Sequence, residues 1–332
     1  MQNQIFFEDK IFIAGANGMV GASIFRKLKK VGYGSSKLGG VILTPNRKSL
    51  NLLNYENVND WFKEFKPNVV VLAAAKVGGI YANNSKPADF LIENLKIQNN
   101  VIENAWKNGV RRLLFLGSSC IYPKFAQQPI KEEYFLKGEL EKTNEPYAIA
   151  KIAGIKLCET LRKQYDFDAI SIMPTNLYGP GDNYHPNNSH VMAALIRKFY
   201  EAVKNSQKEV ICWGSGEPMR EFLHVDDLGA AATFILEKWS PQFSYQNSDQ
   251  ISFLNVGTGY DIKIKDLAKK IAFFAGFKGE IKWDKTKPDG TPRKLLDIGR
   301  INALGWEPKI ELDYGIKKTI NDFSKIYEAI NN

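Results

Sequence analysis

A tyrosine and a lysine stand four positions apart, at Tyr147 and Lys151, in a segment whose pattern predicts a helix to about residue 165. Residues with this spacing share one face of a helix, so the phenol and the ammonium would lie one turn apart. A nearby positive charge lowers the pKa of a tyrosine from about 10 towards neutral pH. With the Ser118 hydroxyl to hold a substrate oxygen, this set could pass a proton to or from a carbinol while a hydride moves. An exposed tyrosine beside a solvated lysine is the alternative interpretation of the pair alone.

Ser118 lies in a loop of small and nucleophilic side chains that follows a predicted strand. The apolar run 113–116 indicates a buried strand, and Gly117, Ser118 and Cys120 come directly after it. Open α/β sheets bind their ligands outside the carboxyl ends of their strands. We therefore expect this loop to face a ligand.

A glycine-rich loop near the start of the chain supplies the context that hydride chemistry needs. Residues 10–14 predict a short buried strand, Gly15, Gly18 and Gly21 follow it, and residues 22–31 have the pattern of an amphipathic helix. This order is typical of a dinucleotide site, in which glycines allow a tight turn and close approach of the backbone. The helix N-terminus then presents unpaired N–H groups to the pyrophosphate. A purely structural loop is the alternative.

The end of the second predicted strand, residues 41–44, indicates which dinucleotide is bound. Sites specific for NAD usually carry an acidic residue here, which binds the ribose hydroxyls. This chain has Arg47 and Lys48 after the strand, and no aspartate or glutamate. Two cationic side chains suit a 2′-phosphate, so the sequence predicts NADP(H) as the cofactor. A solvated loop is the alternative.

Buried strands and amphipathic helices alternate through the first half of the chain, which predicts an α/β fold with a doubly wound parallel sheet (Rossmann). Further strands are predicted at 68–75, 111–116, 169–173, 209–213, 252–256 and 280–283, and further helices at 55–65, 88–108, 191–204, 228–238 and 263–275. Residues 174–181 are predicted as a loop, and residues 214–227 lead into the helix at 228–238.

The alternation loosens after about residue 183, which predicts a smaller C-terminal substrate domain interleaved with the first domain. We assign residues 1–182 and 217–260 to the NADP-binding domain, and residues 183–216 and 261–332 to the nucleotide-sugar (substrate) domain. A chain of 332 residues is long enough for both.

Composition narrows the class of protein further. No apolar run approaches the roughly 20 residues of a membrane span, and residues 1–10 lack a secretion signal. Cysteines 120, 158 and 212 have no metal-ligand spacing, so we expect no metal site and a reducing, cytoplasmic location. The net charge of +9 suits nucleic acids, anionic small molecules or simple solubility. Because the lysines are spread along the chain, we expect neither a nucleic-acid nor a membrane partner.

In this order, the glycine loop, Ser118 and the Tyr147–Lys151 pair resemble the extended short-chain dehydrogenase/reductases over nearly the whole chain. The resemblance implies an NAD(P)-binding sheet domain and a smaller domain for a nucleotide-diphosphate sugar. Longer motifs are similar to the members that epimerise and then reduce a GDP-4-keto-6-deoxy sugar with NADPH. These motifs are residues 73–80, 117–123, 143–151, 174–180, 188–191 and 213–227.

The resemblance implies a role for each catalytic side chain. Tyr147 would protonate the C4 oxygen of the sugar, Lys151 would lower its pKa and hold the nicotinamide ribose, and Ser118 would bind the sugar oxygen. Cys120 and His190 would be the acid/base pair that moves protons at C3 and C5. A 4-ketone acidifies both neighbouring C–H bonds, so groups with pKa values near neutrality could exchange those protons. By themselves, a buried cysteine and a capping histidine would be the expected roles of Cys120 and His190.

Binding contacts and assembly also follow from the resemblance. Cofactor contacts fall on Gly15, Asn17, Gly18, Met19, Val20, Gly21, Arg47, Lys48, Ala74, Leu116, Gly117, Ser118, Lys151, Pro174, Asn176, Leu177 and His190. GDP-sugar contacts fall on Lys198, Trp213, Arg220 and Asp289. Many members have arginine in place of Asn17, so Arg47 and Lys48 are expected to take over its contact with the 2′-phosphate. A homodimer through the helices near 88–108 and 147–165 is implied as well.

Two other functions stay open at this point. One is another nucleotide-sugar epimerase or reductase of the same fold, with a tightly held NAD. The other is a catalytically silent protein that only binds NADP. If the protein were catalytically silent, we would expect the Ser118, Tyr147 and Lys151 set to be lost, but the set is complete here.

Overall fold

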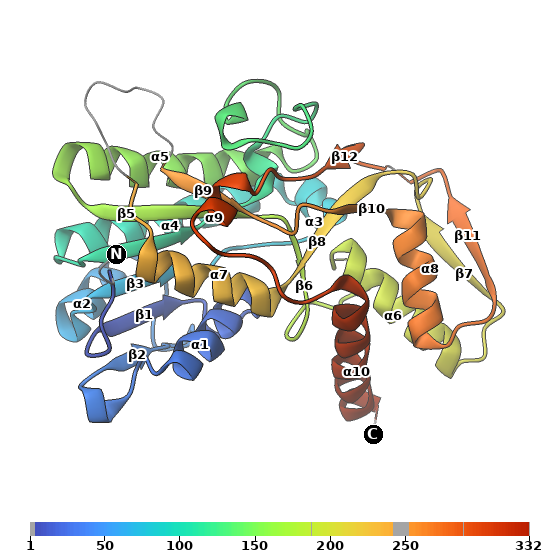
Figure 1. Ribbon diagram of the computed structural model, residues 1–332, viewed down its shortest axis with the longest axis horizontal. Coiled ribbons are helices and arrows are strands. Elements are labelled where there is room, and N and C mark those ends of the chain that lie inside the picture. The colour runs from blue at the N-terminus through green and yellow to red at the C-terminus, as the bar shows by residue number, and fades with distance from the viewer. Residues whose placement is uncertain (1–3, 187, 242–251, 288, 332) are drawn as a thin grey trace.

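The computed structural model describes residues 4–186, 188–241, 252–287 and 289–331, and its centre is a six-stranded sheet in which every pair is parallel (Figure 1). In spatial order the strands are β2 (Val41–Leu43), β1 (Lys10–Ala14), β3 (Val69–Leu72), β4 (Arg112–Leu116), β5 (Asp168–Pro174) and β9 (Phe253–Val256). The chain order reverses between β1 and β3, and ligands bind outside the carboxyl ends of strands at such a point. The predicted doubly wound α/β fold is confirmed.

Helices cover both faces of this sheet, which is why its strands are mainly apolar. One face carries α2 (Tyr55–Phe65), α4 (Pro87–Lys107) and α5 (Glu145–Tyr165), and the other carries α1 (Met19–Val31) and α7 (Val225–Lys238). Along β3, Val70 packs into the core of the first face, whereas Val69 and Val71 pack into that of the second. Alternate side chains of a strand point to opposite faces. Burying each of these valines contributes about 1.5–3 kcal/mol.

The right half of Figure 1 is a second unit with a core of its own. A four-stranded sheet contains β8 (Met219–His224), β10 (Asp261–Lys263), β12 (Arg293–Lys294) and β6 (Asn176–Tyr178), and a two-stranded sheet pairs β7 (Glu209–Trp213) with β11 (Glu280–Asp284). The helices of this unit are α6 (Val191–Lys204), α8 (Ile264–Ala275) and α10 (Leu312–Asn331). Strand β9 of the central sheet lies between β8 and β10 in the sequence. The domain bounds assigned above stay a prediction.

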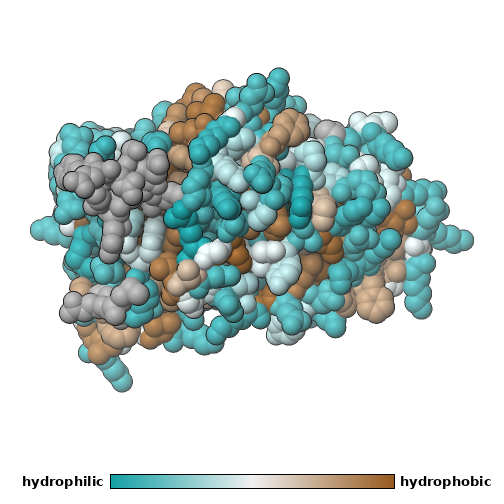
Figure 2. Space-filling view, turned by 45° about the horizontal axis from the view of Figure 1, so that its top comes forward, coloured by the Kyte–Doolittle hydropathy of each residue, from teal (hydrophilic) through white to brown (hydrophobic). Residues whose placement is uncertain are grey.

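The remaining elements are short. They are α3 (Ile80–Ser85), α9 (Gly299–Ala303) and three 3₁₀ turns at Ser36–Leu38, Ser119–Ile121 and Glu132–Tyr134. On the face drawn in Figure 2, hydrophilic side chains predominate and hydrophobic ones form small patches. Within the described residues, none of the helices is long and apolar enough to cross a membrane.

The predicted elements are largely those observed, but the sequence pattern did not predict the strands β6, β8, β10 and β12 or the helices α3, α9 and α10. Strand β6 falls in the predicted loop 174–181, and β8 falls in residues 214–227, to which no strand was assigned. Both belong to the small sheet, where polar residues such as Arg220 and Glu221 interrupt the apolar pattern. The Glu221 carboxylate is fully buried and accepts hydrogen bonds from the backbone N–H groups of Thr258, Gly259 and Leu296. The pattern of hydrophobic residues cannot show that a charged residue such as Glu221 is buried.

Candidate active site

The loop after β4 brings a hydroxyl and a thiol to the carboxyl edge of the central sheet. Ser118 precedes the turn Ser119–Ile121, and its Oγ accepts a hydrogen bond of 3.3 Å from the backbone N–H of Cys120. Gly117 allows close packing here, since an added Cβ would lie 2.3 Å from Met173 Sδ. Cys120 is buried and Ser118 is half-buried. Two chemically different groups therefore lie at one strand end, as the sequence predicted.

Lys151 lies deep in the same site, with only 3% of its surface exposed. Its Nζ donates a 2.8 Å hydrogen bond to the carbonyl oxygen of Leu116, at the end of β4. The Nζ also lies 5.8 Å from the centre of the Tyr147 ring. Withdrawal from water lowers the pKa of Lys151 to about 8, with Cys120 opposing the shift. The helix spacing of the tyrosine and lysine therefore places both against the Ser118 loop.

The pKa of Tyr147 is raised rather than lowered in this arrangement. Burial of the phenol is the main cause, and the nearby Cys120 raises it further, while a hydrogen bond with Ser118 lowers it. The expectation from the pair alone was the opposite direction, because spacing shows the charge of Lys151 but not the loss of water around the ring. Burial also raises the pKa of the Cys120 thiol, which Lys294, Ser118 and Lys151 lower in part. Both Tyr147 and Cys120 thus hold their protons at neutral pH.

His190 stands at the open side of the site, directly before α6. Its pKa lies below its ordinary value because protein crowds the imidazole and the charge of Lys294 opposes protonation. Lys294 comes from β12, next to Arg220 of β8 in the register, and it also acts on Cys120. Sequence reasoning missed Lys294. One lysine in a loop-like segment carries no signal, and only the pairing of β12 with β8 brings it to the site.

The glycine loop fits the pyrophosphate of a dinucleotide. Gly15 has a φ of +87°, which favours glycine, and a Cβ on Gly21 would lie 2.2 Å from the carbonyl oxygen of Gly15. Gly18 precedes α1 and offers no side-chain cap, which leaves the first N–H groups of the helix for phosphate oxygens. Asn17, Met19 and Val20 lie in the same turn. A Cβ added to Gly181 would lie 3.5 Å from Met19 Cα, so a second loop packs beside the glycine loop.

Arg47 and Lys48 follow β2 and are both exposed. Their turn is closed by Asn46, whose Oδ1 accepts hydrogen bonds from the backbone N–H groups of Lys48 at 2.9 Å and Ser49 at 3.0 Å. The structure therefore places two cations where the adenosine ribose of a dinucleotide lies in this fold.

The other predicted cofactor residues lie along the same edge of the sheet. The backbone of Ala74 packs against Gly15, where an added Cβ would lie 2.7 Å from Ala74 N. Pro174 ends β5, and Asn176 and Leu177 lie in β6. The predicted cofactor site is thus assembled from strand ends that are far apart in the sequence.

The predicted substrate residues form two groups in the second unit. The Lys198 Nζ donates a 2.8 Å hydrogen bond to the Ile211 carbonyl and lies 5.3 Å from the centre of the Trp213 ring, which is 51% exposed. Lys287, a residue that sequence reasoning missed, lies 5.7 Å from the same ring. An exposed indole beside two ammonium groups can stack on a base while the cations meet phosphates.

The second group is Arg220 and Asp289. Burial lowers the pKa of Arg220 to about 10, against the charge of Asp289. The Asp289 carboxylate accepts hydrogen bonds from Ser215, at 2.7 Å from the backbone N–H and 2.8 Å from the hydroxyl. Among the residues that the structure describes, no group of histidine, cysteine, aspartate or glutamate side chains could hold a metal ion.

Comparison with known proteins agrees with this geometry. Residues 11–246 match the NAD dependent epimerase/dehydratase family. The chain is 51% identical to GDP-L-fucose synthase of Escherichia coli K12, over 95% of this chain and 97% of that one. It is also 51% identical to GDP-L-fucose synthase 1 of Arabidopsis thaliana, over 95% and 93%. Among solved structures, MlghC, a GDP-mannoheptose C4 reductase from Campylobacter jejuni with NADP bound, matches with a TM-score of 0.85 and 35% identity, over 96% and 99%.

Proposed function

Because this chain belongs to the NAD dependent epimerase/dehydratase family, as an extended short-chain dehydrogenase/reductase, we propose that it converts GDP-4-keto-6-deoxy-D-mannose to GDP-L-fucose with NADPH. The reaction inverts C3 and C5 of the sugar and then reduces the 4-keto group. One observation carries the proposal: a second pair of proton-transfer groups, Cys120 and His190, shares Lys294 beside the reductase set. Reduction alone does not need that pair.

Reduction uses the Ser118, Tyr147 and Lys151 set. Ser118 donates a hydrogen bond to the C4 oxygen, and the Tyr147 hydroxyl transfers its proton to that oxygen. The raised pKa of Tyr147 keeps it protonated until this step, and the ammonium of Lys151 stabilises the tyrosinate that forms. NADPH, when bound, supplies the hydride that C4 receives.

Epimerisation uses Cys120 and His190. One of them removes the proton next to the ketone, and the other returns a proton to the opposite face of the carbon. The positive charge of Lys294 favours the thiolate of Cys120 and the neutral form of His190. These are the forms that accept a proton, so Lys294 supports the base in either assignment.

Binding residues follow the two halves of the molecule. The loop of Gly15, Gly18 and Gly21 holds the pyrophosphate of NADP(H), and Arg47 and Lys48 meet its 2′-phosphate. The carboxyl ends of β4 and β5 and strand β6 hold the nicotinamide half. In the second unit, Trp213 stacks on the guanine, and the cationic Lys198 and Arg220 bind phosphate and hydroxyl oxygens.

We extend the proposal to assembly and location. The faces of α4 and α5 expose Ile92 and Ile149, at 51% and 43%, which suits the packing of these helices in a homodimer. The three cysteines are free and buried, in keeping with a cytoplasmic protein. Light scattering that gives the mass of one chain would refute the dimer.

The function is tested with purified protein, GDP-4-keto-6-deoxy-D-mannose and NADPH. We expect absorbance of the reduced cofactor to fall and the product to have the L-fucose configuration. Repeating the reaction with NADH at the same ionic strength tests cofactor choice, and equal affinity for the two would refute the role of Arg47 and Lys48. A product that keeps the manno configuration at C3 and C5 would contradict the epimerase half.

A C4 reductase without epimerase activity is the second candidate. It is favoured by the full-length match to the GDP-mannoheptose C4 reductase, at 35% identity. Incubation in D₂O without NADPH separates the two. The epimerase incorporates deuterium at C3 and C5 of the substrate, whereas a simple reductase leaves both positions unlabelled.

A further inference from the structure

Two consecutive glycines, Gly78 and Gly79, lie in the loop between β3 and α3, and the function proposed above gives them no role. In Figure 1, α3 lies at the middle of the molecule, between the central sheet and the second unit. The loop therefore stands where the two halves of the site meet.

Gly79 packs directly on the segment that ends in His190. Its backbone N–H donates a 3.3 Å hydrogen bond to the carbonyl oxygen of Asn188, and an added Cβ would lie 2.6 Å from the carbonyl oxygen of Ser189. Its φ is −68°, which any residue adopts. Close approach to the backbone of Ser189 is therefore what requires glycine here, not the conformation of the loop.

Gly78 packs in the other direction, towards Tyr147. A Cβ there would lie 2.8 Å from the Cβ of Ala82 and 3.1 Å from Cζ of Phe90. Phe90 is buried, and its ring meets the Tyr147 ring edge to face, with 6.4 Å between the centres. A side chain on Gly78 would thus press on the ring that supports Tyr147.

The loop is fixed in place by two buried side-chain amides. Asn83 Nδ2 donates to the carbonyl oxygens of Gly78 at 2.7 Å and Gly79 at 3.1 Å. Asn94 accepts a hydrogen bond from the Lys76 backbone N–H at 2.9 Å and donates one to its carbonyl oxygen at 3.0 Å. Both amides are at most 5% exposed. A loop with these hydrogen bonds is rigid, so it can hold the segments that pack against it in fixed positions.

We propose that Gly78 and Gly79 are positioning residues, with Gly79 setting the place of His190 and Gly78 that of Tyr147. The inference rests on the proposed function for the roles of those two side chains. It goes further in assigning the two proton-transfer steps to separate contacts of one loop. A side chain added at either glycine should then slow one of the two steps more than the other.

The test compares Gly79→Ala with Gly78→Ala in two assays. Deuterium uptake from D₂O without NADPH reports proton transfer at C3 and C5. Hydride transfer is measured in the reverse direction, in a single turnover of GDP-L-fucose and NADP⁺. This reaction begins with oxidation at C4, so the rate at which NADPH appears reports hydride transfer. We expect Gly79→Ala to slow deuterium uptake at least tenfold while hydride transfer changes less than threefold. We expect the opposite selectivity for Gly78→Ala.

Gly109→Ala is the matched control, because Gly109 lies outside the site and a Cβ there meets nothing within 4 Å. It should leave both assays unchanged, although its φ of +73° strains the backbone. If Gly79→Ala does not fold, Asn83→Ala loosens the same loop with both glycines kept, and both steps should slow. Equal losses in both assays for both glycine variants would overturn the inference. If wild-type protein is inactive in both assays, the proposed function fails instead.

Discussion

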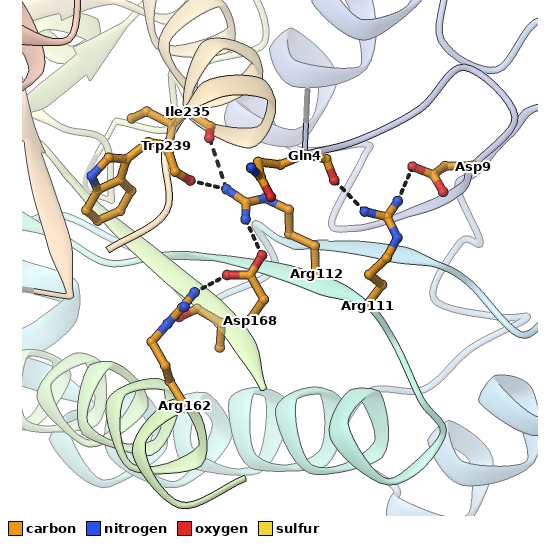
Figure 3. A network of polar contacts seen from close by, with 9 residues as sticks. Gln4, Asp9, Arg111, Arg112, Arg162, Asp168, Ile235 and Trp239 are labelled. Atoms are coloured by element: carbon orange, nitrogen blue, oxygen red, sulfur yellow. Dashed lines mark hydrogen bonds and ion pairs between the residues drawn. The ribbon is translucent and has the colours of Figure 1, made fainter. Parts of the chain in front are cut away.

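The two ends of the central sheet bury charge in opposite ways. At the carboxyl end, Lys151 is buried, its ammonium donates a hydrogen bond to the Leu116 carbonyl, and burial lowers its pKa to about 8. At the amino end, the fully buried Arg112 pairs with Asp168, which also pairs with Arg162 of α5 (Figure 3). The Arg112 guanidinium further donates to the carbonyl oxygens of Ile235 and Trp239, where α7 ends. Within the part of the chain that the structure describes, the buried Lys151 has no carboxylate within ion-pair distance, whereas the buried Arg112 has Asp168.

The difference shows that charged groups at the amino end of the sheet stabilise the fold, whereas those at the carboxyl end serve the reaction. A buried ion that is paired and hydrogen-bonded keeps its charge, and removal of one partner is costly. A buried ion without a counter-ion changes its pKa and can then exchange a proton near neutral pH. The amino end of the sheet thus connects β4, β5, α5 and α7, while the carboxyl end carries the reactive groups. Variants at the two ends should therefore fail in different assays.

Tyr147→Phe should give the largest effect, and only on activity. Loss of the phenol removes the proton donor to C4, which lowers the rate of NADPH oxidation by about 10²–10⁴-fold. Because phenylalanine keeps the ring and its edge-to-face contact with Phe90, thermal unfolding should be nearly unchanged. Deuterium uptake at C3 and C5 should continue. A variant that reduces the substrate at the wild-type rate would remove Tyr147 from the mechanism.

Asp168→Ala should give the converse result, a loss of stability without a loss of chemistry. It leaves the buried Arg112 without its carboxylate, which costs about 3–5 kcal/mol in the free energy of unfolding. Denaturant unfolding measures this loss, and the rate per folded molecule should stay at that of the wild type. Asp60→Ala, at an exposed position, is the control and should change stability by less than about 0.5 kcal/mol. Equal stability of the two variants would refute the contrast between the sheet ends.

The pH dependence of reduction should reveal the lowered pKa of Lys151. Its ammonium is present below about pH 8 and is lost above it, so kcat/KM for reduction should fall about tenfold per pH unit on the alkaline side. Lys151→Arg keeps the positive charge to higher pH because a guanidinium loses its proton only above about pH 12. Its alkaline limb should move up by more than one pH unit, even if its maximal rate is lower. Coincident profiles would show that another group titrates.

The central sheet was predictable from the sequence because its inner strands are buried on both faces and are therefore short, mainly apolar runs. The Tyr147–Lys151 pair and the glycine loop were predictable because local spacing alone fixes their geometry on a helix and in a turn. Their presence at one edge follows from the parallel order of the strands. Local pattern and parallel topology were enough for this part of the site.

What the sequence did not predict depends on long-range pairing and burial. Lys294 reaches the site only because β12 pairs with β8, and the direction of the Tyr147 pKa depends on lost solvent. Arg112 is a further case. A charged pair at the start of a strand is expected to be solvated, yet Arg112 is 0% exposed while the adjacent Arg111 side chain is 41% exposed.

Those two neighbouring arginines give the smallest predicted effect and the sharpest internal control. Arg111 Nη2 lies 2.6 Å from Asp9 and the guanidinium reaches the Gln4 carbonyl, on the side of β4 away from Asp168 (Figure 3). The Arg111 side chain keeps water, and the buried Asp9 keeps the hydrogen bond that it accepts from the Phe6 N–H. Arg111→Ala should therefore cost only about 1 kcal/mol, and less as salt screens the pair. Arg112→Ala should cost several times more, because it leaves Asp168 with Arg162 alone and empties a buried space. Denaturant unfolding of both variants, at low and high salt, measures the difference. Equal costs would mean that burial is not what separates the two residues.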